Sequence, residues 1–271
     1  MNTNRIAKTD LRFLLKDKYN WNGRKITAIL AGKMDLKKDL ELDISRDIEL
    51  LKNGHPFAYV IGYADFLGCR IDLRYKPLIP RPETEYWVEK AIGELKCRIL
   101  RHPSKQIKIL DLFCGSGCIG ISLLKHIPNL KVTFGDIDEN ALKQTKFNLE
   151  LNSIPDARYK IVKSNQFSGI HRKFNYIFAN PPYVGTKTRF GKEIFHEPSN
   201  ALFAGEDGLD AIKPFLKEAE KFLSPFGNIY MEFGDSQKNN INRLLKEYGC
   251  KSRHFYKDQF SKYRWVKTSS F

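Results

Sequence analysis

From Ile107 onward, short apolar runs alternate with segments whose apolar residues recur at helical spacing. The predicted strands are 107–112, 131–136, 158–162, 174–179 and 228–233, and the predicted helices are 117–126, 139–152, 210–223 and 236–248. Strands joined through helices lie parallel in one sheet, with helices on both faces. A last pair of strands, 253–256 and 263–267, has no room for a helix between them and adds an antiparallel edge. The sequence therefore predicts an α/β fold with a doubly wound, mostly parallel, seven-stranded sheet.

The residues before this region follow other patterns. Up to about residue 54, apolar residues recur at helical spacing, in the groups Leu11, Leu14, Leu15; Ile26, Ile29, Leu30; and Leu36, Leu40, Ile44, Ile48, Leu51. Residues 57–79 then look strand-like, with Gly62 and Gly68 as turns, and a helix is predicted over 84–98. We therefore expect a helical domain over 1–54, a β-hairpin connector over 55–81 and the α/β domain over 82–271.

A glycine-rich loop follows the first strand of the predicted sheet. Gly115, Gly117 and Gly120 match G-x-G-x-x-G, and Asp136 ends the next strand, a pattern typical of dinucleotide sites. Asp111, just before the loop, argues against a dinucleotide because its carboxylate would repel a pyrophosphate. The same carboxylate suits the amino group of S-adenosylmethionine, whose ribose hydroxyls Asp136 can bind. Glycines at these positions would let the backbone approach that ligand closely.

A second motif, Asn180-Pro181-Pro182-Tyr183, follows the predicted strand 174–179. Neither proline donates a backbone N–H, and each holds the residue before it in an extended conformation. The Asn180 side chain and the Pro181 carbonyl could therefore accept both N–H groups of a planar NH2, and Tyr183 could cover the flat group. An ordinary turn is the plainer alternative. A methyl-transfer site is favoured because ligands bind at the carboxyl ends of parallel strands, where Asp111 and Asp136 also lie.

Two kinds of substrate present such an NH2 group: a glutamine amide and the exocyclic amine of a nucleic-acid base. The excess of 46 basic over 31 acidic residues, a net charge of +15, favours a polyanionic partner, although the charges are spread along the chain as on a solvated surface. An adenine N6 methyltransferase needs a target-recognition region for base flipping, and no segment after Tyr183 is spare for one. A non-catalytic S-adenosylmethionine-binding protein is disfavoured, because both aspartates, the loop glycines and Asn180 are intact.

The composition limits the remaining possibilities. No long uncharged apolar run is present, and the N-terminus lacks the apolar core of a signal peptide. The five cysteines are an odd number without a Cys-x-x-Cys pair, which favours reduced thiols over disulfides or a zinc site. We therefore expect a cytoplasmic, monomeric protein that binds no metal and no membrane.

These motifs resemble the class I, S-adenosylmethionine-dependent methyltransferases with an Asn-Pro-Pro-Tyr motif. More narrowly, they are similar to the glutamine methyltransferases of peptide-chain release factors, the HemK/PrmC family. The resemblance runs from about Pro56 to the C-terminus, and its most specific part is Leu78-Ile79-Pro80-Arg81-Pro82-Glu83-Thr84-Glu85. The other matching pieces are the run from Phe57 to Gly62, Asp111 to Gly117, Asp136, Asn180 to Tyr183, Glu197-Pro198, Ala201 to Asp210 and Glu232-Phe233-Gly234.

The resemblance implies a methyltransferase sheet and methylation of the amide nitrogen N5 of the glutamine in a release factor's Gly-Gly-Gln motif. The helical domain would dock the release factor. The substrate would be the release factor that is not bound to the ribosome. The implied catalytic residues are Asn180, Pro181 and Tyr183, and Pro182 joins them in binding the substrate. The implied cofactor-binding residues are Asp111, Phe113, Cys114, Gly115, Ser116, Gly117, Asp136, Ile137, Asn165, Gln166 and Asn180.

Two places depart from the family pattern. Ser164-Asn165-Gln166-Phe167 stands where the family has an aspartate and an aromatic residue beside the adenine. Asn165 can still donate and accept hydrogen bonds, and Gln166 would lie beside the adenine. Cys114 occupies a loop position that usually holds a small residue, and we predict a packed rather than a reactive thiol there.

Overall fold

The computed structural model describes residues 7–33, 42–101, 106–188 and 196–269. The chain divides into two compact units, one formed by Met1–Tyr63 with Phe190–His196 and the other by Ala64–Arg189 with Glu197–Phe271. Leu36 and Leu40, which belong to the predicted helical pattern, lie outside the described residues. In the part of the chain that is described, no helix has the length and apolar character needed to span a membrane.

The first unit is helical. Its elements are α1 (Lys8–Phe13), the π-helical turn η1 (Leu14–Lys18), α2 (Gly23–Leu30), α3 (Leu42–Lys52) and α4 (Phe57–Ile61). Helix α2 begins after Asn22, whose side chain accepts the Lys25 N–H at 3.0 Å. The buried residues that hold this unit together are Leu11, Leu14, Leu15, Ile26, Ile29, Ile44, Ile48 and Val60.

The strand-like reading of the residues after Pro56 is wrong for 57–61, which form α4. Gly62, with a φ of 96°, ends this helix in the left-handed conformation. A single helical turn is too short for periodicity to distinguish it from a strand. The hairpin itself is present as β1 (Tyr63–Phe66) and β2 (Cys69–Asp72). Its turn places Leu67 and Gly68 at positive φ, as a two-residue hairpin loop requires.

The second unit contains the predicted seven-stranded sheet, and the fold class is confirmed. Its strands lie in the order β5-β4-β3-β6-β7-β9-β8, and β9 pairs antiparallel with both β7 and β8. The bounds are β3 (Ile107–Leu112), β4 (Leu130–Asp136), β5 (Tyr159–Lys163), β6 (Phe174–Ala179), β7 (Leu223–Glu232), β8 (Ser252–Lys257) and β9 (Tyr263–Ser269). Strand β3 lies between β4 and β6, so the chain order reverses beside β3. In such sheets the reversal opens a crevice at the carboxyl ends of the strands.

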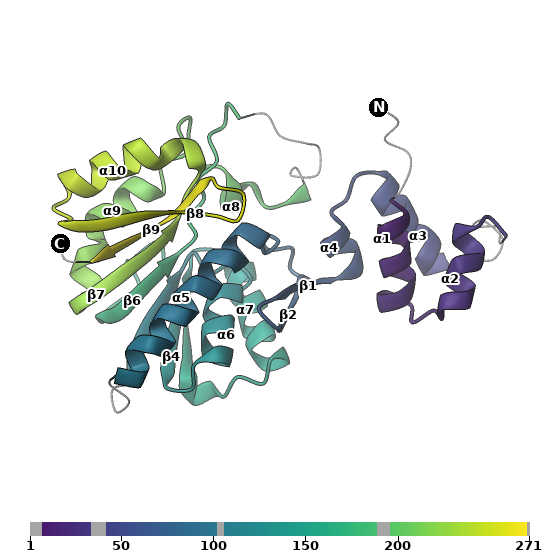
Figure 1. Cartoon of the computed structure of the whole chain (residues 1–271), viewed down its shortest axis with the longest axis horizontal. Coiled ribbons are helices and arrows are strands. Elements are labelled where there is room, and N and C mark those ends of the chain that lie inside the picture. The colour runs from purple at the N-terminus through teal and green to yellow at the C-terminus, as the bar shows by residue number, and fades with distance from the viewer. Residues whose placement is uncertain (1–6, 34–41, 102–105, 189–195, 270–271) are drawn as a thin grey trace. The chain divides into compact units, whose positions relative to one another are not determined.

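Helices cover both faces of the sheet (Figure 1). One face carries α5 (Pro82–Arg101), α6 (Cys118–His126) and α7 (Glu139–Leu151), and the other carries α9 (Ile212–Ala219) and α10 (Lys238–Glu247). Short elements connect them: η2 (Asp156–Arg158), α8 (Ser199–Leu202), η4 (Glu220–Phe222) and η5 (Asp235–Gln237). Alternate strand residues such as Leu110, Ile177 and Ile229 pack against α9 and α10. On the opposite face, Trp87 of α5 stacks on Phe178 with ring centroids 5.9 Å apart.

Candidate active site

Three of the predicted site residues lie at the same edge of three adjacent strands. Asp111 is near the end of β3, Asp136 ends β4, and Asn180 follows β6 directly. The registers align these ends, because Leu112 pairs with both Gly135 and Ala179. The residues predicted to bind the cofactor and the acceptor therefore lie together at the carboxyl edge of the sheet, where such folds bind ligands.

Asp111 is buried, with 1% of its surface exposed. Its Oδ2 accepts the Gly120 N–H at 2.9 Å, whereas its Oδ1 has no hydrogen-bond partner among the described residues. Burial raises the pKa of Asp111 to about 8; the Gly120 N–H opposes this shift, and the charge of Asp136 adds to it. A buried carboxylate oxygen without a donor is unfavourable, so the site fits a ligand that brings one.

Asp136 organises the glycine loop. Its Oδ2 accepts the Gly115 N–H at 2.9 Å, and its Oδ1 accepts the Asp138 N–H at 3.0 Å. Burial raises the pKa of Asp136, and these N–H donors counter the effect. A Cβ added at Gly115 would meet nothing within 4 Å, so the loop backbone borders open space that a ligand can reach.

The neighbouring loop residues have different surroundings. Phe113 has a φ of 62°, and its ring contacts Phe215 edge-on at 5.9 Å. Ile137 is 55% exposed next to Asp136, although it is a large apolar side chain. Cys114 is buried, its Sγ lies 3.5 Å from Thr145 Oγ1, and burial raises the pKa of the thiol well above its usual value. The loop cysteine is thus a packed, neutral thiol.

The segment predicted to flank the adenine lies beside the end of β4. The Ser164 N–H donates to the Asp136 carbonyl at 2.8 Å. Asn165 is exposed, and Gln166, with a φ of 51°, donates from Nε2 to the Ala211 carbonyl at 3.3 Å. Phe167 belongs to the core, where its ring stacks on Phe222 at 4.4 Å. Of these four residues, only Asn165 is exposed, and Gln166 is half-buried.

The Asn180 side chain and the Pro181 carbonyl accept no hydrogen bond from any described residue. Tyr183, by contrast, is held at two points. Its hydroxyl donates to Glu232 Oε1 at 2.9 Å, and its carbonyl accepts from Gln237 Nε2 at 2.9 Å. Burial and the charge of Glu232 raise the pKa of Tyr183, so the phenol remains protonated. The motif thus combines free acceptors with a fixed aromatic ring.

Two buried carboxylates bind residues 79–87, which we call the brace, and one of them, Glu232, also holds Tyr183 of the motif. Glu232 Oε2 accepts from Thr84 Oγ1 and Trp87 Nε1, each at 2.7 Å. Glu197 accepts the Ile79 N–H at 3.0 Å and pairs with Arg81. The sequence had marked these pieces only by resemblance and assigned them no role. The available signal was an acid, Glu232, at the end of an otherwise apolar strand.

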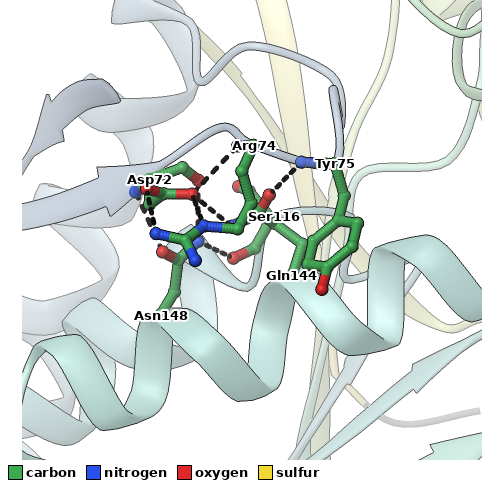
Figure 2. A network of polar contacts seen from close by, with 6 residues as sticks. All are labelled: Asp72, Arg74, Tyr75, Ser116, Gln144 and Asn148. Carbon is green, nitrogen blue, oxygen red and sulfur yellow. Dashed lines mark hydrogen bonds and ion pairs between the residues drawn. The ribbon is translucent and has the colours of Figure 1, made fainter. Parts of the chain in front are cut away.

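Two amide side chains of α7 bind the residues after β2, and one of them, Asn148, also binds the glycine loop (Figure 2). Asn148 donates to the carbonyls of Ser116 at 2.9 Å and Asp72 at 3.1 Å, and accepts the Asp72 N–H at 2.9 Å. Gln144, one turn earlier, accepts the Tyr75 N–H at 2.8 Å. Sequence reasoning missed both residues, although their spacing of four places them on one helix face. Among the described residues, no group of three or more His, Cys, Asp or Glu could hold a metal ion.

Comparison with known proteins agrees with this geometry. The family model for the methyltransferase small domain matches residues 95–208. The release factor glutamine methyltransferase of Buchnera aphidicola subsp. Schizaphis graminum is 35% identical over 238 residues, covering 86% of this chain and 82% of that protein. This chain belongs to the release factor glutamine methyltransferase family. The resemblance inferred from the motifs is confirmed.

Other relatives extend the comparison. A bifunctional methyltransferase of Rickettsia prowazekii is 36% identical over 230 residues, and the match spans 79% of this chain but only 44% of that protein. The crystal structure of the N-terminal domain of human METTL16 in complex with SAH is similar with a TM-score of 0.53 at 18% identity, over 90% of this chain and 93% of that chain. At that identity the likeness shows the methyltransferase fold alone.

Proposed function

We propose that this chain transfers a methyl group from S-adenosylmethionine to the side-chain amide nitrogen of the glutamine in a release factor's Gly-Gly-Gln motif. One observation carries the proposal: the free acceptors at Asn180 and Pro181 follow β6, next to the strand that carries the unpaired Asp111 oxygen. An anion beside two neutral acceptors suits a cationic methyl donor next to a planar NH2 group.

The residues at the strand ends fit the cofactor. When bound, S-adenosylmethionine supplies an electrophilic methyl group. Asp111 would hold its amino group through the free Oδ1, and Asp136 would accept from its ribose hydroxyls. Ile137 would pack against its adenine. The remaining cofactor contacts would come from Phe113, Cys114, Gly115, Ser116, Gly117, Asn165, Gln166 and Asn180.

The Asn-Pro-Pro-Tyr motif orients the acceptor. Asn180 Oδ1 and the Pro181 carbonyl each accept one amide N–H, so the nitrogen lone pair faces the methyl group. Pro182 and Tyr183 cover the flat amide. The nitrogen gains positive charge as it takes the methyl, which these acceptors stabilise, and it then loses one proton to solvent. Catalysis is therefore alignment and charge stabilisation, without a base acting first.

The remaining parts have supporting roles. Residues 1–54 dock the release factor, and residues 82–271 carry out methyl transfer. Residues 55–81 connect these two domains. The support for a protein partner is the name shared by relatives that are 32–35% identical over most of their length. The enzyme works in the cytoplasm as a monomer, on the factor free of the ribosome.

The test uses labelled S-adenosylmethionine with four acceptors: a release factor, its Gln→Ala variant, DNA and RNA. We expect label in the unaltered factor alone. Label on nucleic acid alone would mean that the acceptor is the amine of a base and not a glutamine amide. No transfer to any of the four would indicate a non-catalytic binding protein. Asn180→Ala should abolish turnover while cofactor binding largely survives. Near-normal turnover by that variant would refute the acceptor role of Asn180.

A further inference from the structure

We propose that Glu232 is a positioning residue for methyl transfer, which fixes the Tyr183 ring and through it the acceptor-binding motif. The inference rests on the proposed function and adds Glu232, a buried residue that binds Tyr183 of the acceptor motif.

The Glu232 carboxylate has a fixed orientation. Two donors from α5, Thr84 Oγ1 and Trp87 Nε1, occupy Oε2 at 2.7 Å each. Their positions turn Oε1 toward Tyr183, whose hydroxyl donates to it at 2.9 Å. Hydrogen bonds to a charged acceptor are stronger and more directional than neutral ones. The Tyr183 hydroxyl is therefore bound to a carboxylate whose own orientation is fixed.

Burial makes this arrangement unfavourable for stability alone. Glu232 is 1% exposed, and a buried carboxylate loses most of its hydration. Apolar side chains in place of Glu232 and its three donors together would fill the end of β7 without that desolvation. A second buried carboxylate, Glu197, binds the other end of the brace through Ile79 and Arg81. Glu232 thus connects the brace to Tyr183, whereas Glu197 connects it to the residues just before α8.

The fixed Tyr183 constrains Asn180. Gln237 Nε2 holds the Tyr183 carbonyl, and Gly208 packs so closely on that carbonyl that an added Cβ would lie 2.1 Å from its oxygen. Only Pro181 and Pro182 separate Tyr183 from Asn180, and the rings of prolines restrict backbone rotation. The position of the phenol therefore limits where the Asn180 amide can point.

Glu232 acts through Tyr183 rather than on the substrate. Its carboxylate is 1% exposed and accepts from Thr84, Trp87 and Tyr183, and of these three donors only Tyr183 belongs to the acceptor motif; the charge of Arg264 lies near both Glu232 and Tyr183. Loss of the contact should therefore lower the rate of transfer and leave cofactor binding intact. A residue needed only for folding would lower stability and both functions together.

A double-mutant cycle tests the inference with the full chain. Glu232→Gln can keep one oxygen for Thr84 and Trp87 but offers an NH2 group to the Tyr183 hydroxyl, and Tyr183→Phe removes that hydroxyl. We expect each single variant to lower kcat about tenfold or more, with cofactor Kd changed less than twofold. In the Tyr183→Phe background, Glu232→Gln should lower kcat by less than about twofold further.

Glu94→Gln is the matched control, because the Glu94 carboxylate also accepts from a tyrosine of β7, Tyr230, at 2.8 Å. Its kcat should equal that of the unaltered enzyme. The cycle is run on whichever acceptor the unaltered enzyme labels, so a nucleic-acid substrate would overturn the proposed function and leave Glu232 testable. No transfer by the unaltered enzyme would overturn both.

The inference is wrong if Glu232→Gln lowers kcat equally in both backgrounds, or if its loss is matched by weaker cofactor binding. If Glu232→Gln does not fold, Thr84→Val takes its place, since it frees one side of the Glu232 carboxylate. It should lower kcat with cofactor Kd unchanged, and an unchanged kcat would overturn the inference.

Discussion

The carboxylate of Asp111 is held from one side, by the Gly120 N–H at 2.9 Å, and its other oxygen is left without a partner among the described residues. The Gly120 amide lies in the first turn of α6, where helix N–H groups favour an anion. Burial nevertheless raises the pKa of Asp111 from 3.8 to about 8. The carboxyl group is therefore mostly protonated near neutral pH, and a cation bound beside it would favour its ionised form.

Cofactor binding should therefore release a proton. At about pH 6.5 the free enzyme holds Asp111 mostly protonated, because its pKa is about 8, whereas pairing with an ammonium group needs the ionised form. Affinity should rise as the pH increases from about 6 to 8. Calorimetry in two buffers of different ionisation enthalpy measures the proton directly. In Asp111→Asn this release should vanish, and unchanged release would show that another group titrates.

The same shift affects stability without ligand. The pKa of Asp111 is raised on folding, from 3.8 to about 8, so the native state binds a proton more tightly than the unfolded chain does. The stability due to this group is present below about pH 4 and is lost as the pH rises toward 8. Urea unfolding of Asp111→Asn should lack this component of the pH dependence.

Gly120→Ala should destabilise the protein. An added Cβ would lie 2.3 Å from the Phe134 ring and 2.9 Å from Asp111 Oδ2, so α6 would have to move away from the sheet. Overpacking of this kind costs about 1–3 kcal/mol in the free energy of unfolding. Gly93→Ala is the control, because a Cβ there would meet nothing within 4 Å on an exposed position of α5. That change should be neutral or stabilising by about 0.5–1 kcal/mol.

Asn148→Ala should weaken cofactor binding as well as the fold. It leaves the carbonyls of Ser116 and Asp72 without their donor in a buried place, at a cost of roughly 2–4 kcal/mol. Because Ser116 belongs to the glycine loop, cofactor Kd should increase even at temperatures where the variant is fully folded. Asn140→Ala, at an exposed position of the same helix, should change neither. An unaltered Kd in Asn148→Ala would mean that the loop holds its shape alone.

Gly208→Ala should slow methyl transfer. Both Gly208 (φ 71°) and Gly249 (φ 84°) have left-handed backbones, but only at Gly208 would a Cβ collide with the Tyr183 carbonyl. Gly249→Ala therefore measures the backbone strain, about 1 kcal/mol, without a collision. We expect kcat to fall in Gly208→Ala and to stay normal in Gly249→Ala. Equal kcat values would contradict the close packing on Tyr183.

The sheet could be predicted from sequence because its strands are apolar runs separated by amphipathic helices. The strand-end residues Asp111, Asp136 and Asn180 followed from that prediction, since parallel strands end at one edge. Helix α4 was missed because five residues show no clear period. The contacts of Glu232 with Thr84, of Asn148 with Ser116 and of Gln237 with Tyr183 were missed because these partners lie 32 to 148 residues apart in sequence, and local spacing carries no information on such pairs.

Through the brace, the conformation of the Asn-Pro-Pro-Tyr motif depends on residues that are far from it in the sequence. Residues 79–87 are not among the residues proposed to bind the acceptor, yet Thr84 and Trp87 bind Glu232, which in turn holds Tyr183 of the motif. Residues 79–87, 180–188, 197–208 and 232–237 therefore form a single exchangeable unit, although they are far apart in the chain. A chimera that takes the acceptor motif from a relative without the other two stretches would receive the right side chains on an unsupported loop.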